Sequence, residues 1–379
     1  MPAKNQHYVP RVYIKSWETT VFSLREPHKP FQGVYEYLDH SFDTGNGITK
    51  EKVLCGNHTY TIDKEYFFVV PNCHQVALDF GNKIKGILNQ RSVTASFQGR
   101  SLLDPLDLGN ELPALENWSF SDATSRNGVS IKIKKAIKNQ ISDLRSYTIE
   151  DRFSTTIEND WQSILSCFLH EVQYAAPMGP EKTRTISPDS TNNMLISVFL
   201  MAFRNPDFDF AGVYPSVEKA IILPLFESLS NGNPASEWNQ VPKILRRGYW
   251  ITEVYKALFG NKKSAFDAMI TNAKKHLKFM LFEANCDGEF ITSDNPAFFH
   301  ISNVESKNNN AIYFPLSPKH LLSLVRTDKS NLDEVAYRSV DLNDLRKINR
   351  IILNESRHTV ISSRKHIAYL IYFREKHTA

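Results

Sequence analysis

A titratable histidine lies close to the start of the sequence, in Gln6-His7-Tyr8-Val9-Pro10. Imidazole titrates near pH ~6.5, so it can accept and donate protons at cellular pH. The flanking Gln6 and Tyr8 carry hydrogen-bonding groups that suit substrate contacts. The motif predicts either a catalytic or ligand-binding His7, or an N-terminal strand anchored by its aromatic residues, with His7 hydrogen-bonded in a polar crevice.

A second group of polar residues follows an apolar segment, in Phe290-Ile291-Thr292-Ser293-Asp294-Asn295-Pro296. Strand ends of this kind are where sheets often present functional groups. The Asp294 carboxylate can orient an imidazole, bind a cation or accept a proton, and Ser293 and Asn295 can position a substrate. The same residue types before a proline also build turns, because their side chains hydrogen-bond the loop backbone. Both interpretations stay open.

Two further charged residues lie in predicted helices. Arg204 ends an apolar helix before Asn205-Pro206, where it would neutralise the negative end of the helix dipole. Its planar fork of donors also suits an anion clamp for phosphate or carboxylate. Glu158 lies at the edge of the apolar stripe of a long helix, which fits either a solvated helix edge or a metal ligand.

These motifs resemble a family called domain of unknown function 4238, found in bacteria and fungi. The family opens with Q-H-Y-V-P-x-x-Y/F-L, has an apolar strand leading into T-S-D-N-P and then P-L-S-P, and carries a central R-x-P, an acidic helix position and an Asn on a late helix. The matching positions are Gln6–Ile14 (with Ile14 in place of Leu), Ile291–Pro296, Pro315–Pro318, Arg204–Pro206, Glu158 and Asn354. The resemblance runs from residue 6 to about 362 and implies a shared fold and site, without naming a reaction.

The elements that must position these residues change in kind along the chain. Residues 1–145 read as β-rich, with a long loop over 99–130, residues 146–285 as helical, and residues 286–379 as β-rich again. Strands, helices and then strands predict an α+β protein, in which both β-rich ends build a mixed sheet packed on a central helical region. We expect the three parts to form one integrated unit.

Hydrophobic periodicity defines the individual elements. The segment 129–138 fits a strand and a helix equally well. Helices are predicted over 146–172, 189–203, 216–229, 265–283 and 342–356, and strands over 34–38, 60–70, 289–293, 311–314, 321–326, 359–362 and 367–373.

Composition sets broad limits. The chain has 379 residues, 45 Lys and Arg against 41 Asp and Glu, and a net charge of +4, which is mildly basic. The four scattered cysteines, the absence of an apolar leader and the short apolar runs favour a cytoplasmic protein that does not span a membrane. The phosphate-loop, dinucleotide-binding, HExxH and GxSxG signatures are missing from the sequence, which argues against the enzyme classes that they mark.

These observations predict a phosphodiester hydrolase, most simply a nuclease, in a bacterial defence or toxin system. His7 would be the general acid/base, Asp294 would orient it, and Arg204 would steady the anionic transition state. Asp294 and Glu158 are the candidate ligands for Mg²⁺ or Mn²⁺. The expected partner is nucleic acid, drawn by basic segments at 132–138 and 262–278. The candidate substrate-binding residues are Gln6, Tyr8, Ser293, Asn295 and Asn354.

Two alternatives belong to other classes. In the first, the protein is a non-catalytic binding or regulatory module. Gln6, His7, Asp294 and Asn295 then form a buried hydrogen-bond network that ties the N-terminal strand to the C-terminal sheet. In the second, the enzyme acts on a small anionic metabolite.

Overall fold

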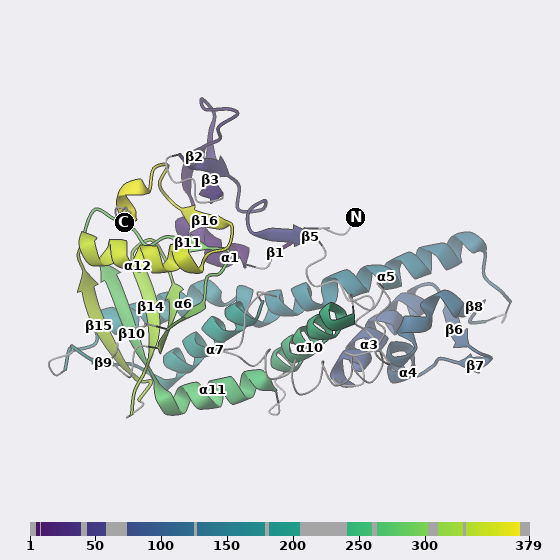
Figure 1. The fold of residues 1–379 in the computed structure, drawn as a ribbon. Coiled ribbons are helices and arrows are strands. Elements are labelled where there is room, and N and C mark those ends of the chain that lie inside the picture. Colours follow the sequence, from purple (N-terminus) through teal and green to yellow (C-terminus); the bar gives the residue numbers. More distant parts are fainter. Residues whose placement is uncertain are drawn as a thin grey trace, which may run out of the picture. The chain divides into compact units, whose positions relative to one another are not determined.

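The computed structural model describes residues 5–7, 9–38, 44–57, 74–124, 127–178, 182–204, 241–259, 264–301, 310–328 and 331–371. The chain folds into two compact units, each made of separate stretches. The first comprises Met1–Gln6, Asn57–Thr155 and Asp209–Phe266, and the second His7–Gly56, Thr156–Phe208 and Asp267–Ala379. Helices and mixed sheets confirm the predicted α+β class (Figure 1). The division into three consecutive parts stays a prediction.

The larger sheet of the second unit has six strands in the order β12-β13-β14-β10-β15-β9. All neighbours are antiparallel except β10 and β15, which run parallel, and β10, β14 and β15 lie side by side in Figure 1. The strands are β9 (Arg184–Thr185), β10 (Leu277–Ala284), β12 (Phe298–Ile301), β13 (Asn310–Pro315), β14 (His320–Arg326) and β15 (Glu334–Val340).

The second sheet joins the two ends of the chain. Its strand order is β11-β16-β3-β2, and β4 also pairs with β3. β3 from the N-terminal part lies antiparallel to β16 from the C-terminal part, with Thr359 opposite Leu38. This pairing confirms that both β-rich ends share a sheet. The strands are β2 (Thr19–Phe22), β3 (Pro30–Leu38), β4 (Asn46–Ile48), β11 (Thr292–Ser293) and β16 (Thr359–Ser362).

Helices of the second unit connect and cover these strands. α12 begins at an Asp341 cap, whose carboxylate accepts the amides of Asn343 and Asp344, each at 2.9 Å. Its apolar stripe faces the core, as the residue spacing predicts. The helices are α1 (Arg11–Ile14), η1 (Lys15–Trp17), α6 (Trp161–Tyr174), α7 (Pro188–Arg204), α11 (Ala265–His276), α12 (Leu342–Glu355) and η6 (Ala368–Leu370).

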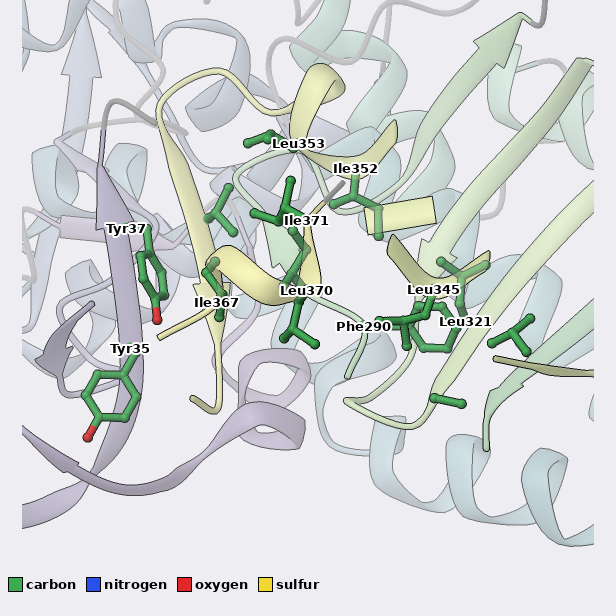
Figure 2. Close-up of a cluster of buried hydrophobic side chains, with 14 of the residues drawn as sticks. Tyr35, Tyr37, Phe290, Leu321, Leu345, Ile352, Leu353, Ile367, Leu370 and Ile371 are labelled. Carbon is green, nitrogen blue, oxygen red and sulfur yellow. The ribbon is translucent and has the colours of Figure 1, made fainter. Parts of the chain in front are cut away.

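A buried apolar cluster fixes the second sheet against α12 (Figure 2). Tyr35 and Tyr37 of β3 contribute from the N-terminal part, and Leu345 and Ile352 contribute from α12. Each fully buried side chain of this size stabilises the fold by about 1.5–3 kcal/mol relative to exposure. The cluster therefore holds the two ends of the chain together independently of any polar contact.

The first unit is built on helices with a small sheet. α3 and α4 pack closely because both carry glycine at the contact: a Cβ on Gly81 would lie 1.5 Å from the Pro105 carbonyl oxygen, and one on Gly109 would lie 1.9 Å from that of Ala77. The elements are α3 (His74–Gln90), β6 (Val93–Phe97), β7 (Arg100–Ser101), α4 (Pro105–Asn110), η2 (Leu112–Asn117), β8 (Ser119–Asp122), α5 (Ile131–Phe153) and α10 (Val241–Leu258).

Several predicted elements are wrong in the N-terminal half. The segment 99–130 is no long loop, since it contains β7, α4, η2 and β8. Asp104 caps α4 and Pro105 takes its first position, which are ordinary helix-start signals. Residues 74–90 form α3 although the region was expected to be β-rich. The ambiguous segment 129–138 is helical from Ile131, where α5 begins.

Two further predictions fail near the C-terminal half. The helix expected over 265–283 ends at His276, and β10 follows it directly. β10 lies between β14 and β15, so sheet pairing overrides the helix propensity of its Leu, Met and Lys residues. A 3-10 turn, η6, occupies part of the strand expected over 367–373. The strand expected over 60–70 and the helix expected over 216–229 lie outside the described residues.

Candidate functional site

His7 ends β1 (Asn5–His7), which pairs with β5 (Cys55–Asn57) in a two-stranded sheet. Pro10 then leads into α1, with φ −59° and ψ 137°. The His7 side chain is buried, with 8% of its surface exposed. The Gln6 side chain and the whole of Tyr8 lie outside the described residues, so their predicted substrate contacts stay predictions.

Arg204 binds the N-terminal motif directly. Its Nε donates to the His7 carbonyl oxygen at 2.7 Å, and its Nη1 donates to Glu158 Oε1. The Arg204 side chain is 2% exposed and the Glu158 side chain 13% exposed, so this ion pair is largely buried. Arg204 is the last residue of α7, as predicted, but Glu158 and the His7 backbone satisfy its charge and donors. They occupy Nε and Nη1 of the fork that an anion clamp would use, and that role of Arg204 stays a prediction.

Glu158 reaches Arg204 from an irregular turn. The predicted long helix over 146–172 is interrupted, because α5 ends at Phe153 and a π-helical turn, η3 (Ser154–Glu158), precedes α6. π-helical turns occur frequently at functional sites. Here the turn carries the carboxylate that partners Arg204.

Burial and two arginines keep the His7 imidazole neutral. Desolvation, followed by the positive charges of Arg11 and Arg204, lowers its pKa from 6.5 to about 4, although the Val53 backbone and the Glu158 carboxylate act in the opposite direction. At pH 7 the ring is therefore uncharged and has a nitrogen able to accept a proton. A neutral imidazole in this setting has the protonation state that a general base requires.

Asp294 is engaged by the loop before β16. Its carboxylate accepts the backbone amides of Arg357, His358 and Thr359 at 3.0, 2.8 and 3.1 Å, and its own amide donates to the Thr359 carbonyl. The side chain is 7% exposed. These contacts match the turn-building interpretation of the T-S-D-N-P motif. None of these three bonds reaches His7, whose acidic neighbour in the described chain is Glu158.

The other residues of the C-terminal motif also make structural contacts. Ser293 Oγ donates to the Asn295 carbonyl and accepts the Asn295 amide, at 3.2 and 3.1 Å. The Asn295 side chain donates to the Glu355 carbonyl at 3.2 Å. Asn354 is exposed on α12. The predicted roles of these three residues in substrate binding stay predictions.

The two end motifs meet through aromatic residues. Tyr13 Oη lies 2.7 Å from Thr292 Oγ1 and donates to the Pro315 carbonyl at 2.8 Å. Trp17 Nε1 donates to the Phe290 carbonyl at 2.9 Å. Both aromatic side chains are fully buried. The N-terminal motif is thereby fixed against the T-S-D-N-P and P-L-S-P segments.

Two buried polar residues were missed by sequence reasoning. Asn349, fully buried on α12, accepts the Ile291 amide at 3.2 Å and donates to the carbonyls of Glu289 and Leu370 at 2.9 and 3.2 Å. The Glu289 carboxylate accepts the amide of Ser363 at 2.9 Å and both hydroxyls of Ser362 and Ser363. An Asn inside an apolar helix stripe was the available signal, since such a residue needs buried partners.

The predicted Mg²⁺ or Mn²⁺ cofactor stays a prediction. Within the ranges that the structure describes, no three His, Cys, Asp or Glu side chains gather closely enough to hold a metal ion. The two predicted ligands are also separately engaged, Glu158 by Arg204 and Asp294 by backbone amides. Among the described helices, none is long and apolar enough to cross a membrane.

The motifs and their geometry agree with one family. A family model described as a protein of unknown function, DUF4238, matches residues 5–366. The chain belongs to the DUF4238 family. Neither a curated protein nor a solved structure matches it. In this member of the family, the Q-H-Y-V-P and T-S-D-N-P motifs are joined by Tyr13 and Trp17.

Proposed function

We propose that this DUF4238 protein is a phosphodiester hydrolase, nuclease-like in substrate, that uses His7 as its general acid/base. The observation that supports the proposal is the neutral imidazole held beside two guanidinium groups, Arg11 and Arg204. A neutral imidazole is in the protonation state that a general base requires, and the positive charge of Arg11 favours an anionic substrate. The proposal includes a cytoplasmic location and a role in a bacterial defence or toxin system.

In the reaction, His7 takes the proton of the attacking water or ribose hydroxyl as the new oxygen–phosphorus bond forms. The imidazolium then returns this proton to the leaving oxygen as the old bond breaks. Arg204 and Glu158 are positioning residues, because they hold the backbone of His7 and set the charge around its ring. We assign Asp294 a positioning role as well, through the loop that leads into β16.

The experiment is cleavage of single- and double-stranded RNA and DNA by the full chain, with Mg²⁺, with Mn²⁺ and with a chelator. We expect cleavage that His7→Ala abolishes and that the matched control His28→Ala, an exposed histidine in a turn, leaves unchanged. In a bacterial host, the wild-type chain should arrest growth and the His7 variant should not. Equal cleavage by the wild type and His7→Ala refutes the proposal.

The second candidate is a non-catalytic binding or regulatory module. The observation that favours it is burial: His7, Arg204 and Asp294 are 8%, 2% and 7% exposed, and each makes contacts that hold the fold. This candidate predicts that variants of all three lose stability together and that no polymer is cleaved. The hydrolase predicts that His7→Gln loses cleavage while the chain stays folded at pH 7.

A further inference from the structure

The turn between β13 and β14 brings a serine hydroxyl against an imidazole. The P-L-S-P segment, Pro315–Pro318, leads out of β13, and β14 begins at His320. Ser317 Oγ lies 3.0 Å from His320 Nδ1. Both residues are partly exposed, so a small molecule from solution can reach the pair. The proposed function uses neither of them.

The hydrogen bonds of the turn determine which group of the pair carries the proton. The backbone amides of Lys319 and His320 donate to Ser317 Oγ at 3.2 and 3.1 Å. A hydroxyl has two acceptor lone pairs and one hydrogen, so Oγ, with both lone pairs engaged, directs its hydrogen to Nδ1. His320 Nδ1 is therefore an acceptor, and the ring is neutral with its hydrogen on Nε2. Burial favours the same state, because it lowers the pKa of His320.

A carboxylate lies beside this imidazole. Glu283 of β10 is directly opposite His320 in the antiparallel pairing of β10 with β14. Residues opposite each other in such a pair have Cβ atoms about 4.5–5.5 Å apart on the same face of the sheet. The Glu283 charge raises the pKa of His320, against burial and the charge of Lys319. Glu283 therefore stabilises the imidazolium that forms when the ring takes a proton.

We propose that Ser317 is a nucleophile in a second catalytic site, with His320 as its base and Glu283 as a positioning residue. A hydroxyl within hydrogen-bond reach of a base, with a third group acting on that base, is the arrangement of an activated nucleophile. The two amide bonds to Oγ are at the long end of the N–H···O range. One amide can therefore release a lone pair for attack, while the other stabilises negative charge on the oxygen.

The charges beside the pair favour an uncharged substrate. The Glu283 carboxylate repels an anion. The Lys319 ammonium donates to the carbonyls of Cys286 and Gly288 at 3.1 and 3.4 Å, so these bonds hold it away from a substrate. The class of substrate that fits these charges is a neutral carboxylic ester rather than a phosphodiester.

The reaction passes through an acyl-serine. Ser317 Oγ bonds to the carbonyl carbon while its proton moves to His320 Nδ1. The bond from this carbon to the alcohol oxygen then breaks, and the alcohol leaves with that proton. Water attacks the acyl-serine and gives a proton to Nδ1, which returns it to Ser317 Oγ as the carboxylic acid leaves.

The test is reaction of the full chain with a fluorophosphonate, a reagent that bonds to activated serine hydroxyls, with the labelled residue located by peptide mass spectrometry. We expect the label on Ser317 and a reaction slower by about 10²-fold in His320→Asn. Asparagine can still accept the hydroxyl within the turn but is no base. Hydrolysis of p-nitrophenyl acetate should fall in the same variant. The matched control is His28→Ala, which removes an exposed histidine and should react like the wild type.

Three results overturn the proposal: a wild-type chain without label on Ser317, equal labelling rates in the wild type and His320→Asn, or no Ser317-dependent hydrolysis of the ester. Ser317→Cys gives a second measurement that needs no serine chemistry. Iodoacetamide should alkylate the thiol at this position at least about tenfold faster than in the double variant Ser317→Cys, His320→Asn, because the base favours the thiolate. Equal alkylation rates would refute the role of His320.

Two further variants test the positioning residue and the independence of this site. Glu283→Gln should slow the labelling of Ser317 and move its pH midpoint downward, because the charge that raises the His320 pKa is lost. An unchanged rate and midpoint would refute the role of Glu283. His7→Gln, which removes the base of the proposed phosphodiester hydrolase, should leave the labelling of Ser317 intact, so either proposal can fail without the other.

Discussion

Replacing Arg204 by methionine tests how the N-terminal motif is held. Methionine is also long and unbranched, but it removes the donors to the His7 carbonyl and to Glu158. Breaking a buried ion pair by removing one partner typically costs about 3–5 kcal/mol, because the other charge stays in a poorly solvated place. Since Glu158 keeps 13% exposure, we expect the lower end, about 3 kcal/mol.

Further variants separate the contributions of Arg204 and Glu158 to the free energy of unfolding. Glu158→Gln keeps an acceptor for Arg204 but leaves its 2% exposed charge without a counter-charge, so it should also cost about 3–5 kcal/mol. The double variant Arg204→Met, Glu158→Leu should cost less than the sum of its single variants by about 0.5–3 kcal/mol, because no charge is left alone. The control is Lys29→Met in the ion pair with Glu26, where the side chains are 76% and 61% exposed. That change should cost less than about 0.5 kcal/mol.

The assay is urea unfolding of the full chain followed by tryptophan fluorescence, since Trp17 and Trp161 are both buried in the second unit. Hydrogen exchange of residues 5–14 gives a local readout, and Arg204→Met should accelerate it. If Arg204→Met unfolds at the same urea concentration as Lys29→Met, the pair does not hold the motif and the reasoning is refuted.

Three other predictions concern the neighbouring contacts. Asp294→Ala should lose roughly 3–5 kcal/mol of unfolding free energy, because one buried and two partly buried amides lose a charged acceptor. Asp287→Ala, at a 97% exposed side chain, is the control and should change little. Asn349→Ala should lower the melting temperature strongly, because backbone groups left without a partner reduce the unfolding free energy by roughly 2–4 kcal/mol. The control Asn354→Ala should leave the melting temperature nearly unchanged. Equal melting temperatures of the two variants would contradict this prediction. Because the unfolded chain protonates His7 below about pH 6.5 and the folded chain only near 4, stability should fall by up to about 3 kcal/mol as pH drops through that window. His7→Gln should remove that part of the pH dependence, and an unchanged profile in this variant would show that His7 is not its source.

The parts of the fold that were predicted correctly are those whose local and tertiary preferences agree. α12 combines an Asp341 cap with a regular apolar stripe, and α7 ends just before a proline, so both were expected. β10 shows the opposite case. Its sequence continues the helical composition of α11, and only pairing with β14 and β15, far away in the sequence, makes it a strand.

The residues of the candidate site show the same contrast between features that the sequence predicts and features that only the fold determines. The types of His7 and Arg204 indicated a polar site, and the position of Arg204 at a helix end follows from the pattern. Its partner Glu158 could not be predicted, because an interruption between α5 and α6 sets the direction of that side chain. Contacts of this kind depend on segments that meet only after folding.

The pH dependence of phosphodiester cleavage tests the central claim most directly. The claim is that a neutral His7 in the folded chain takes the proton of the nucleophile. We predict that kcat/KM rises with pH through an inflection near pH 4, that Arg11→Gln moves this inflection toward 6.5, and that His7→Gln is inactive. A wild-type inflection near 6.5, full activity in His7→Gln, or no cleavage of RNA or DNA at any pH would contradict the account.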